Sequence, residues 1–177
     1  MGIDANSPEA TGFDITDLNE LPEFVGKEFV TPWFSMDDDR SDKFEYSTYL
    51  DSYPNPYEEF EGEGYGEGLV EGFHLLGMID FLLNHVIVPK ARIIPWNYGL
   101  DSVRFVSVVR TSDKFRLVGR LTEAVERGGK GYLVTAELTA EVEGREKPAF
   151  VATQRALWAP LPDRDSNTTP DAAASPR

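Results

Sequence analysis

The second half of the chain, residues 103–158, restricts the possible folds more than any other feature. It contains four segments rich in β-branched and aromatic residues, with frequent apolar/polar alternation: VRFVSVV, KFRLVGRLTEAVE, GYLVTAELTAEVEG and PAFVATQRALW. They are separated by TSD, RGGKG and GREK, which are typical turn sequences. Strands joined by such short turns run antiparallel. The pattern therefore predicts a four-stranded, largely antiparallel sheet.

The segment before these strands, residues 68–90, is apolar on almost all sides and ends near Pro89. A helix without a polar face must be covered by other structure. We therefore expect one long central helix near residues 69–87 with the sheet wrapped around it, an α+β architecture. Too many polar residues interrupt the stretch for a membrane span: Glu71, His74, Asp80, Asn84 and His85.

Residues 13–160 are expected to form a single domain. The two ends, residues 1–12 and 161–177, have few large apolar residues and are predicted to be disordered. Residues 37–68 are acidic and aromatic, with Gly and Pro concentrated toward their end. They are interpreted as a short helix around residues 39–50, followed by a long loop or flap.

The charge of the chain narrows the choice of partners. Seventeen Lys and Arg against 31 Asp and Glu give a net charge of −14. Such a surface repels phosphate backbones and anionic lipid, so we expect no nucleic-acid and no membrane partner. The chain has no cysteine and two histidines, which excludes disulfides, cysteine-ligated zinc and a three-histidine metal site. We expect no metal and no cofactor, and a cytoplasmic location because the acidic N-terminus has no apolar signal segment.

Two sequence motifs resemble those of a known protein family. Residues 97–105, NYGLDSVRF, resemble the NYG-x-x-x-VRF segment of MaoC-like dehydratases, the (R)-specific enoyl-CoA hydratase group. Residues 141–149, EVEGREKPA, resemble the V-E-G-x-x-K-P-A hairpin of that family, and residues 69–73 are similar to the start of its central helix. Trp33 and the pair Phe44 and Thr48 also stand where the family has matching residues. The resemblance implies the hot-dog fold.

The resemblance also implies a chemistry. In the family, an Asp and a His of a D-x-N-P-x-H loop add or remove water across the Cα–Cβ bond of an acyl thioester. Here the loop reads LDSYPNPYE, residues 50–58, and lacks the histidine. One alignment places Tyr53 and Glu58 at the two catalytic positions, and the other makes Asp51 the Asp. The helix start is changed as well, to Glu71-Gly72.

His74, Glu71 and Asp51 are the candidate catalytic residues. His74 follows Glu71 by three positions, near the helix end where the fold holds a thioester carbonyl, and an imidazole titrates near neutral pH. Each residue also has a purely structural interpretation. His74 could be a buried core histidine, Glu71 a carboxylate that complements the helix dipole, and Asp51 part of an Asx turn. Asp80 lies about 180° around the helix from Glu71, so we expect it to contact another element. His85 is interpreted as a charge at the helix C-terminus.

Candidate substrate-binding residues come from the helix start, the aromatic loop and the NYG segment. Four tyrosines in the loop could form an aromatic wall for a bulky ligand, although packing on a dimer partner explains them equally well. The candidates are Gly72, Tyr49, Tyr53, Tyr57, Tyr65, Asn97 and Tyr98.

Taken together, these features favour an enzyme that acts by acid/base chemistry on an acyl-thioester or polyketide-like substrate. It would be a dehydratase or hydratase (a lyase), or a relative repurposed as an isomerase or cyclase. The alternative is a non-catalytic acyl-binding hot-dog subunit of a heteromer. Thioesterase activity is a weaker third hypothesis. A homodimer is expected in either case, because hot-dog sheets expose an edge strand.

Overall fold

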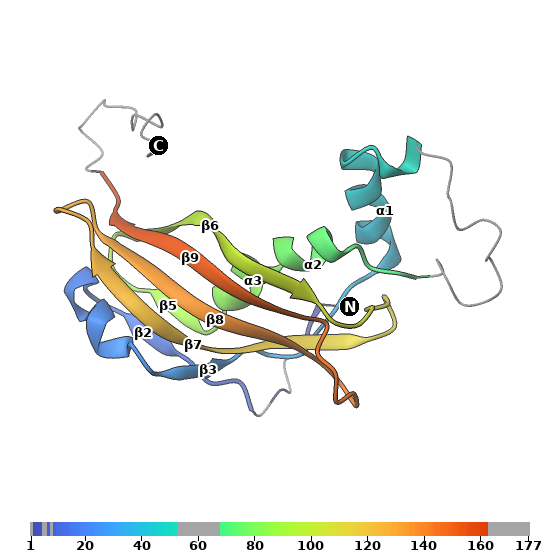
Figure 1. Cartoon of the computed structure of the whole chain (residues 1–177), viewed down its shortest axis with the longest axis horizontal. Coiled ribbons are helices and arrows are strands. Elements are labelled where there is room, and N and C mark those ends of the chain that lie inside the picture. Colours follow the sequence, from blue (N-terminus) through green and yellow to red (C-terminus); the bar gives the residue numbers. More distant parts are fainter. Residues whose placement is uncertain (1, 5–6, 8, 53–67, 163–177) are drawn as a thin grey trace.

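The computed structural model describes residues 2–4, 7, 9–52 and 68–162. One large antiparallel sheet dominates it, with the strand order β1-β4-β7-β8-β9-β6 and with β3 also paired to β7 (Figure 1). Its four long strands are β6 (Ile93–Phe105), β7 (Lys114–Glu126), β8 (Tyr132–Val142) and β9 (Phe150–Pro160). Short N-terminal strands extend it: β1 (Gly2–Ile3), β3 (Glu28–Val30) and β4 (Phe34–Ser35).

Two short helices lie against this sheet where one long helix was predicted. They are α2 (Gly72–Gly77) and α3 (Ile79–Leu83), separated by Met78. Gly77 is a poor helix former, and the chain leaves the helix at Asn84. The β-branched residues that follow then form strand β5 (Ile87–Pro89), which pairs in parallel with β2 (Phe13–Ile15). The predicted length and continuity of the helix were therefore wrong.

The core forms between the helices and the sheet. Leu75, Ile79 and Leu82 follow the helical spacing and are buried. On β7, Phe115 and Leu117 alternate inward, and both have no exposed surface. The sheet thus wraps around a helical segment, and the predicted α+β class is confirmed.

The first long strand differs from the prediction. β6 begins at Ile93, about ten residues before the expected start, and ends at Phe105. Its pairing with β9 shifts register between Asn97 and Gly99 and between Leu100 and Ser102. Pro95 lies within it, which an edge strand tolerates because one side of its backbone has no strand neighbour.

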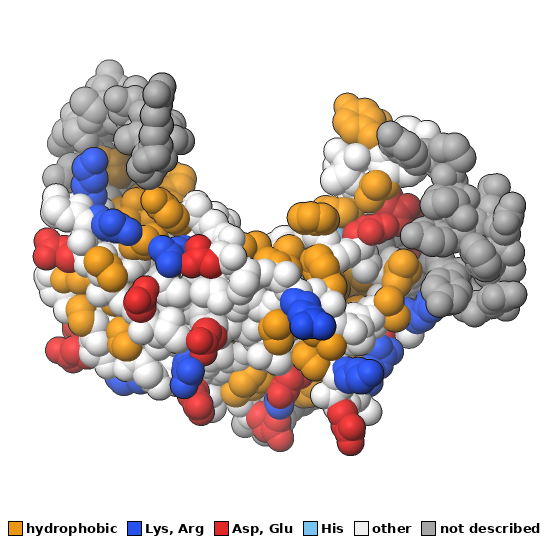
Figure 2. Space-filling view, viewed as in Figure 1, with side chains coloured by type: hydrophobic (Ala, Val, Ile, Leu, Met, Phe, Trp, Pro, Cys, Tyr) orange, Lys and Arg blue, Asp and Glu red, His pale blue; other side chains and the backbone are white. Residues whose placement is uncertain are grey.

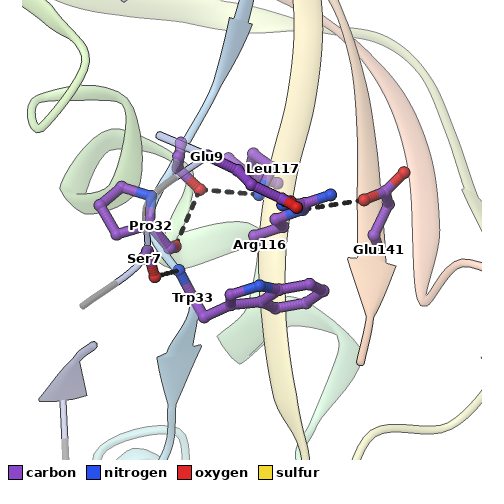
Figure 3. Close-up of polar contacts among 8 residues, drawn as sticks. Ser7, Glu9, Pro32, Trp33, Arg116, Leu117 and Glu141 are labelled. Atoms are coloured by element: carbon purple, nitrogen blue, oxygen red, sulfur yellow. Dashed lines mark hydrogen bonds and ion pairs between the residues drawn. The ribbon is translucent and has the colours of Figure 1, made fainter. Parts of the chain in front are cut away.

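Described residues of the N-terminal segment contact the sheet: Gly2 and Ile3 pair with β4, and Thr11 pairs with Val30 of β3. Asp4 forms an ion pair with Lys114 at 3.2 Å, and Glu9 forms one with Arg116 at 2.6 Å. The Arg116 guanidinium also pairs with Glu141 at 2.9 Å and lies over the Trp33 ring (Figure 3). This segment has few apolar residues, and ion pairs and strand pairing rather than burial hold its described residues to the sheet. Amino-acid composition does not reveal such contacts.

Residues 37–52 form the helical part of the acidic segment. Helix α1 (Asp38–Ser47) begins at Asp37, whose carboxylate accepts a hydrogen bond from the Arg40 N–H at 2.9 Å. A 3₁₀ turn, η2 (Leu50–Ser52), follows, and another, η1 (Leu18–Phe24), lies near the N-terminus. The flap predicted for residues 53–67 and the tail predicted after residue 162 lie outside the described residues. No helix within the described part of the chain is long and apolar enough to cross a membrane.

Candidate functional site

His74 lies in the first turn of α2 and faces α1. Its imidazole stacks on the Phe44 ring, with centroids 4.5 Å apart and planes inclined by 6°. The Nδ1 atom is buried and has no hydrogen-bond partner among the residues that the structure describes. Buried polar atoms are rarely left without a partner, and those that are often belong to functional sites. The stacked, half-buried ring is therefore oriented by packing, with a nitrogen available for a ligand.

A pocket of about 490 Å³ opens beside this imidazole, between α1 and the α2–α3 pair. Apolar walls come from Phe34, Phe44, Met78 and Phe81. Arg40 and Lys43 of α1 add positive charge, and Asp37 adds one carboxylate. The helices that line the pocket, α1 and α2, stand next to each other (Figure 1). An apolar cavity with a few polar groups is typical of a small-molecule site.

Burial lowers the pKa of His74 below its usual value. The neutral imidazole therefore predominates at neutral pH, and this is the form that accepts a proton.

This shift predicts a pH dependence of stability. The pKa of His74 is lower in the folded than in the unfolded chain, so the unfolded state binds more protons once the pH falls below about 6.5. The stability of the wild type is expected to fall through this window as the pH decreases, and His74→Gln is expected to lose that component. Melting temperatures of both proteins at about pH 7 and about pH 5.5 test this. An equal decrease in both proteins would contradict it.

Glu71 and Asp51 are not bonded to His74. Asp51 lies in the exposed turn η2, and Glu71 occupies the position before α2 without capping it by its side chain. Both carboxylates approach Glu45 instead. The pKa of Glu45 is raised, mainly by desolvation and further by the charges of Glu71, Asp42 and Asp51. The structure thus gathers acidic groups near the start of α2, beside the imidazole rather than in contact with it.

A second polar cluster lies on the other flank of the helix pair. The Asn97 side-chain N–H donates to one Asp80 carboxylate oxygen, and the Gln154 N–H donates to the other at 3.1 Å. Gln154 also lies 3.4 Å from the Asn97 side-chain oxygen. These residues come from α3, β6 and β9. Asp80 therefore contacts the sheet, as expected from its position on the helix.

The other predicted binding residues have varied surroundings. A Cβ at Gly72 would lie 2.8 Å from the Phe105 ring, so close packing is a sufficient reason for this glycine. Tyr49 is 75% exposed and has φ of 61°, an uncommon conformation for a residue with a side chain. Tyr98 is exposed on β6. Tyr53, Tyr57 and Tyr65 lie outside the described residues.

Sequence reasoning did not identify Gln154. Its signal was present in the strand pattern, because residues 150, 152, 154, 156 and 158 read Phe, Ala, Gln, Ala and Trp. This alternating set faces the helices, so Gln154 is a polar residue in an otherwise apolar row. Within the described residues, no group of three or more His, Asp or Glu side chains could hold a metal ion.

No family model matches this chain. Nodulation protein N of Rhizobium leguminosarum bv. viciae is 29% identical over 158 residues, which cover 86% of this chain and 95% of that protein. The 3-hydroxyacyl-thioester dehydratase Z of Mycobacterium tuberculosis is 32% identical over 88 residues, 50% of this chain and 58% of that protein.

Solved structures give the fold. The monoamine oxidase regulatory protein of Archaeoglobus fulgidus superposes with a TM-score of 0.64 at 19% identity, over 86% of this chain and 99% of its own. The MaoC-like dehydratase of Rhodospirillum rubrum superposes with a TM-score of 0.58 at 17% identity, over 78% and 94%.

The chain is therefore a hot-dog protein. Within that class it is similar to MaoC-like dehydratases and (R)-hydratases, and the resemblance seen in its sequence motifs is confirmed.

Proposed function

We propose that this protein is an enzyme that uses acid/base chemistry on an acyl-thioester or polyketide-like substrate, as a hydratase or dehydratase or as a repurposed isomerase or cyclase. The observation that carries the proposal is His74. Its imidazole is held by Phe44 beside a pocket and is predominantly neutral at neutral pH because its pKa is lowered, and its buried Nδ1 atom has no partner within the described part of the chain. The similarity to hydratases and dehydratases supports the same class of reaction.

In the proposed reaction, the neutral imidazole accepts a proton either from water or from the carbon next to the thioester carbonyl. The resulting imidazolium returns the proton to the product, so no proton is gained or lost over the cycle. In a two-group version of this reaction, Glu71 or Asp51, which we retain as candidate catalytic carboxylates near the start of α2, would deliver the proton to the product, and the imidazolium would then reprotonate that carboxylate. Arg40 and Lys43 at the pocket wall already pair with Asp37 at 3.5 Å and with Asp39 at 2.5 Å, so an anionic carrier such as the phosphates of coenzyme A would compete with these carboxylates.

The direct test is an assay for the hydration of trans-2-enoyl-CoA thioesters of increasing chain length. Hydration removes the conjugated double bond, so the loss of its absorbance measures the reaction. Turnover of at least one thioester that depends on His74 supports the proposal. The alternative, a non-catalytic acyl-binding subunit, is favoured by one observation: the loop histidine of the related enzymes is missing. Binding of the same thioesters without turnover would establish that alternative and overturn the enzyme proposal.

We also propose that the protein is located in the cytoplasm and that it forms a homodimer. The dimer interface would be the edge of the sheet at β6. This strand has no strand partner on its outer side among the described residues and is exposed over ten of its 13 residues. Trp96, Tyr98, Leu100 and Phe105 add apolar surface to it. Figure 2 shows hydrophobic side chains along the hollowed upper edge of the molecule, where β6 and α2 lie. Long, apolar edge strands favour pairing with another chain.

The dimer is expected to persist at micromolar concentration, where light scattering should give twice the mass of one 19.8 kDa chain. Leu100→Lys places a charge on the proposed interface and is expected to shift the protein toward monomer. Val125→Lys, on the exposed end of β7, is the matched control and should leave the mass unchanged. A wild type that is monomeric at this concentration would contradict the proposal.

A further inference from the structure

Helix α1 is attached to the rest of the fold by few contacts. Seven of its ten residues are exposed, and Ser41 is the one residue of the helix that is buried. Figure 1 shows α1 standing apart from the sheet, next to α2. Segments with few buried contacts open at a much lower free energy than core strands do. We therefore expect α1 to open more readily than the sheet.

The polar contacts of α1 do not tie it to the sheet. In the described part of the chain, every hydrogen bond and ion pair of an α1 side chain stays within residues 37–48. The specific contact with the body of the fold is an aromatic stack, in which Phe44 covers one face of the His74 imidazole at 4.5 Å between ring centroids. This stack is therefore the contact that would hold α1 in place.

The present position of α1 leaves polar atoms buried and unbonded. Within the described residues, three buried side-chain atoms lack a hydrogen-bond partner: Ser41 Oγ, His74 Nδ1 and Arg155 Nε. Arg155 Nε lies 2.7 Å from an Asp101 carboxylate oxygen, and this ion pair accounts for it. The other two atoms belong to α1 and α2. Water would bond both atoms if α1 moved away, so opening recovers hydrogen bonds that closure excludes.

The pocket beside His74 depends on the position of the same helix. One wall comes from α1, through Arg40, Lys43 and Phe44, and another comes from α2 and the residue after it, through His74 and Met78. A movement of α1 would therefore change the width of the pocket and the exposure of the His74 Nδ1 atom together.

We infer that α1 is a lid over His74, which opens as a unit to admit a ligand to this pocket and closes when Phe44 packs on the imidazole. Met36, which is 1% exposed, anchors the chain in the core just before the helix. The movement therefore begins at Asp37, whose backbone is extended. The inference concerns access to His74 rather than turnover, so it can be tested whether or not the proposed reaction occurs.

The test uses the absence of cysteine from the chain, because a single introduced thiol then reports on its own position. Ser41→Cys places a thiol of similar size on the buried side of α1. Ser47→Cys is its exposed reference on the same helix, and Val134→Cys is the core reference on β8. With a water-soluble disulfide reagent, Ser41→Cys is expected to react about tenfold or more slowly than Ser47→Cys. It should still react about 10²-fold or more faster than Val134→Cys, because α1 opens without the sheet.

Phe44→Ala, added to Ser41→Cys, is expected to speed the reaction of that thiol about fivefold or more, since it removes the stack. Tyr46→Ala is the matched control, because this aromatic ring of α1 is 75% exposed, and it should leave the rate unchanged. Should Ser41→Cys fail to fold, hydrogen exchange of the α1 amides in the wild type, Phe44→Ala and Tyr46→Ala gives the same comparison.

Three results would overturn the inference. A Ser41→Cys thiol that reacts as slowly as Val134→Cys would show that α1 opens only when the whole fold does. A rate equal to that of Ser47→Cys would show that α1 does not close over His74. Equal effects of Phe44→Ala and Tyr46→Ala would show that the stack on His74 does not hold the helix.

Discussion

Replacing His74 by alanine is expected to lower turnover about 10²-fold or more on any enoyl thioester that the wild type hydrates. The expected size is that of a typical acid/base contribution. The imidazole lines the pocket beside α1 in its neutral, proton-accepting form, because burial lowers its pKa, and alanine cannot accept or return a proton. The measurement is kcat and KM for both proteins under the same conditions.

His85→Ala is the matched control. His85 is exposed, and its Nδ1 atom lies 2.7 Å from the Phe81 carbonyl oxygen, so it has a structural partner outside the reaction. This variant should keep nearly full activity. Because removing the His74 ring also removes its contact with Phe44, the melting temperature of His74→Ala must be measured beside its activity. Full activity in a folded His74→Ala protein would show that the imidazole takes no part in the reaction.

The largest effect on stability is expected from Phe115→Ala. Phe115 has no exposed surface, packs edge-on against Phe34 at 5.7 Å between ring centroids, and lies at the centre of the sheet on β7. Truncating such a ring removes its burial and leaves a cavity, which typically costs about 3–5 kcal/mol of unfolding free energy. Urea denaturation of both proteins measures this difference.

Val125→Ala, on the same strand, is the control for that experiment. Val125 is 46% exposed, so its truncation is expected to change the unfolding free energy by about 0.5 kcal/mol or less. A small change in Phe115→Ala, similar to that in Val125→Ala, would contradict the assignment of β7 to the centre of the core.

The strands from β7 to β9 could be predicted from the sequence because their signals are local. Alternation places Phe115 and Leu117 on one face, and the Gly-containing turn between β7 and β8 joins neighbouring strands directly. The fold class followed from this pattern together with the apolar segment before it.

The helix was predicted too long because an apolar stretch does not distinguish a buried helix from a buried strand. The apolar, partly β-branched residues 87–89 are compatible with either a helix or a strand. They pair with β2, which lies more than 70 residues earlier in the chain. Such a partner cannot be identified from local periodicity. The contacts of the described N-terminal residues have no local signal either, since the Glu9–Arg116 pair joins distant parts of the chain.

The candidate site was predicted in part. His74 was selected from its chemistry and its place on the helix, and the structure gives it a pocket. Glu71, three positions earlier in the chain, is not bonded to it and precedes α2 rather than lying within it. The juxtaposition of Asp80, Asn97 and Gln154 depends on three elements and on the register shift after Asn97, so no spacing in the sequence indicates it.

The role of His74 is tested most directly by a crystal structure with an unreactive acyl-thioester analogue bound, such as a ketone in which a methylene group replaces the thioester sulfur. The carbon next to the carbonyl, or a water poised to attack the chain, is expected to lie within about 3–4 Å of the His74 imidazole in the pocket between α1 and α2. An analogue bound with its carbonyl away from this pocket, leaving His74 without a ligand contact, would contradict it.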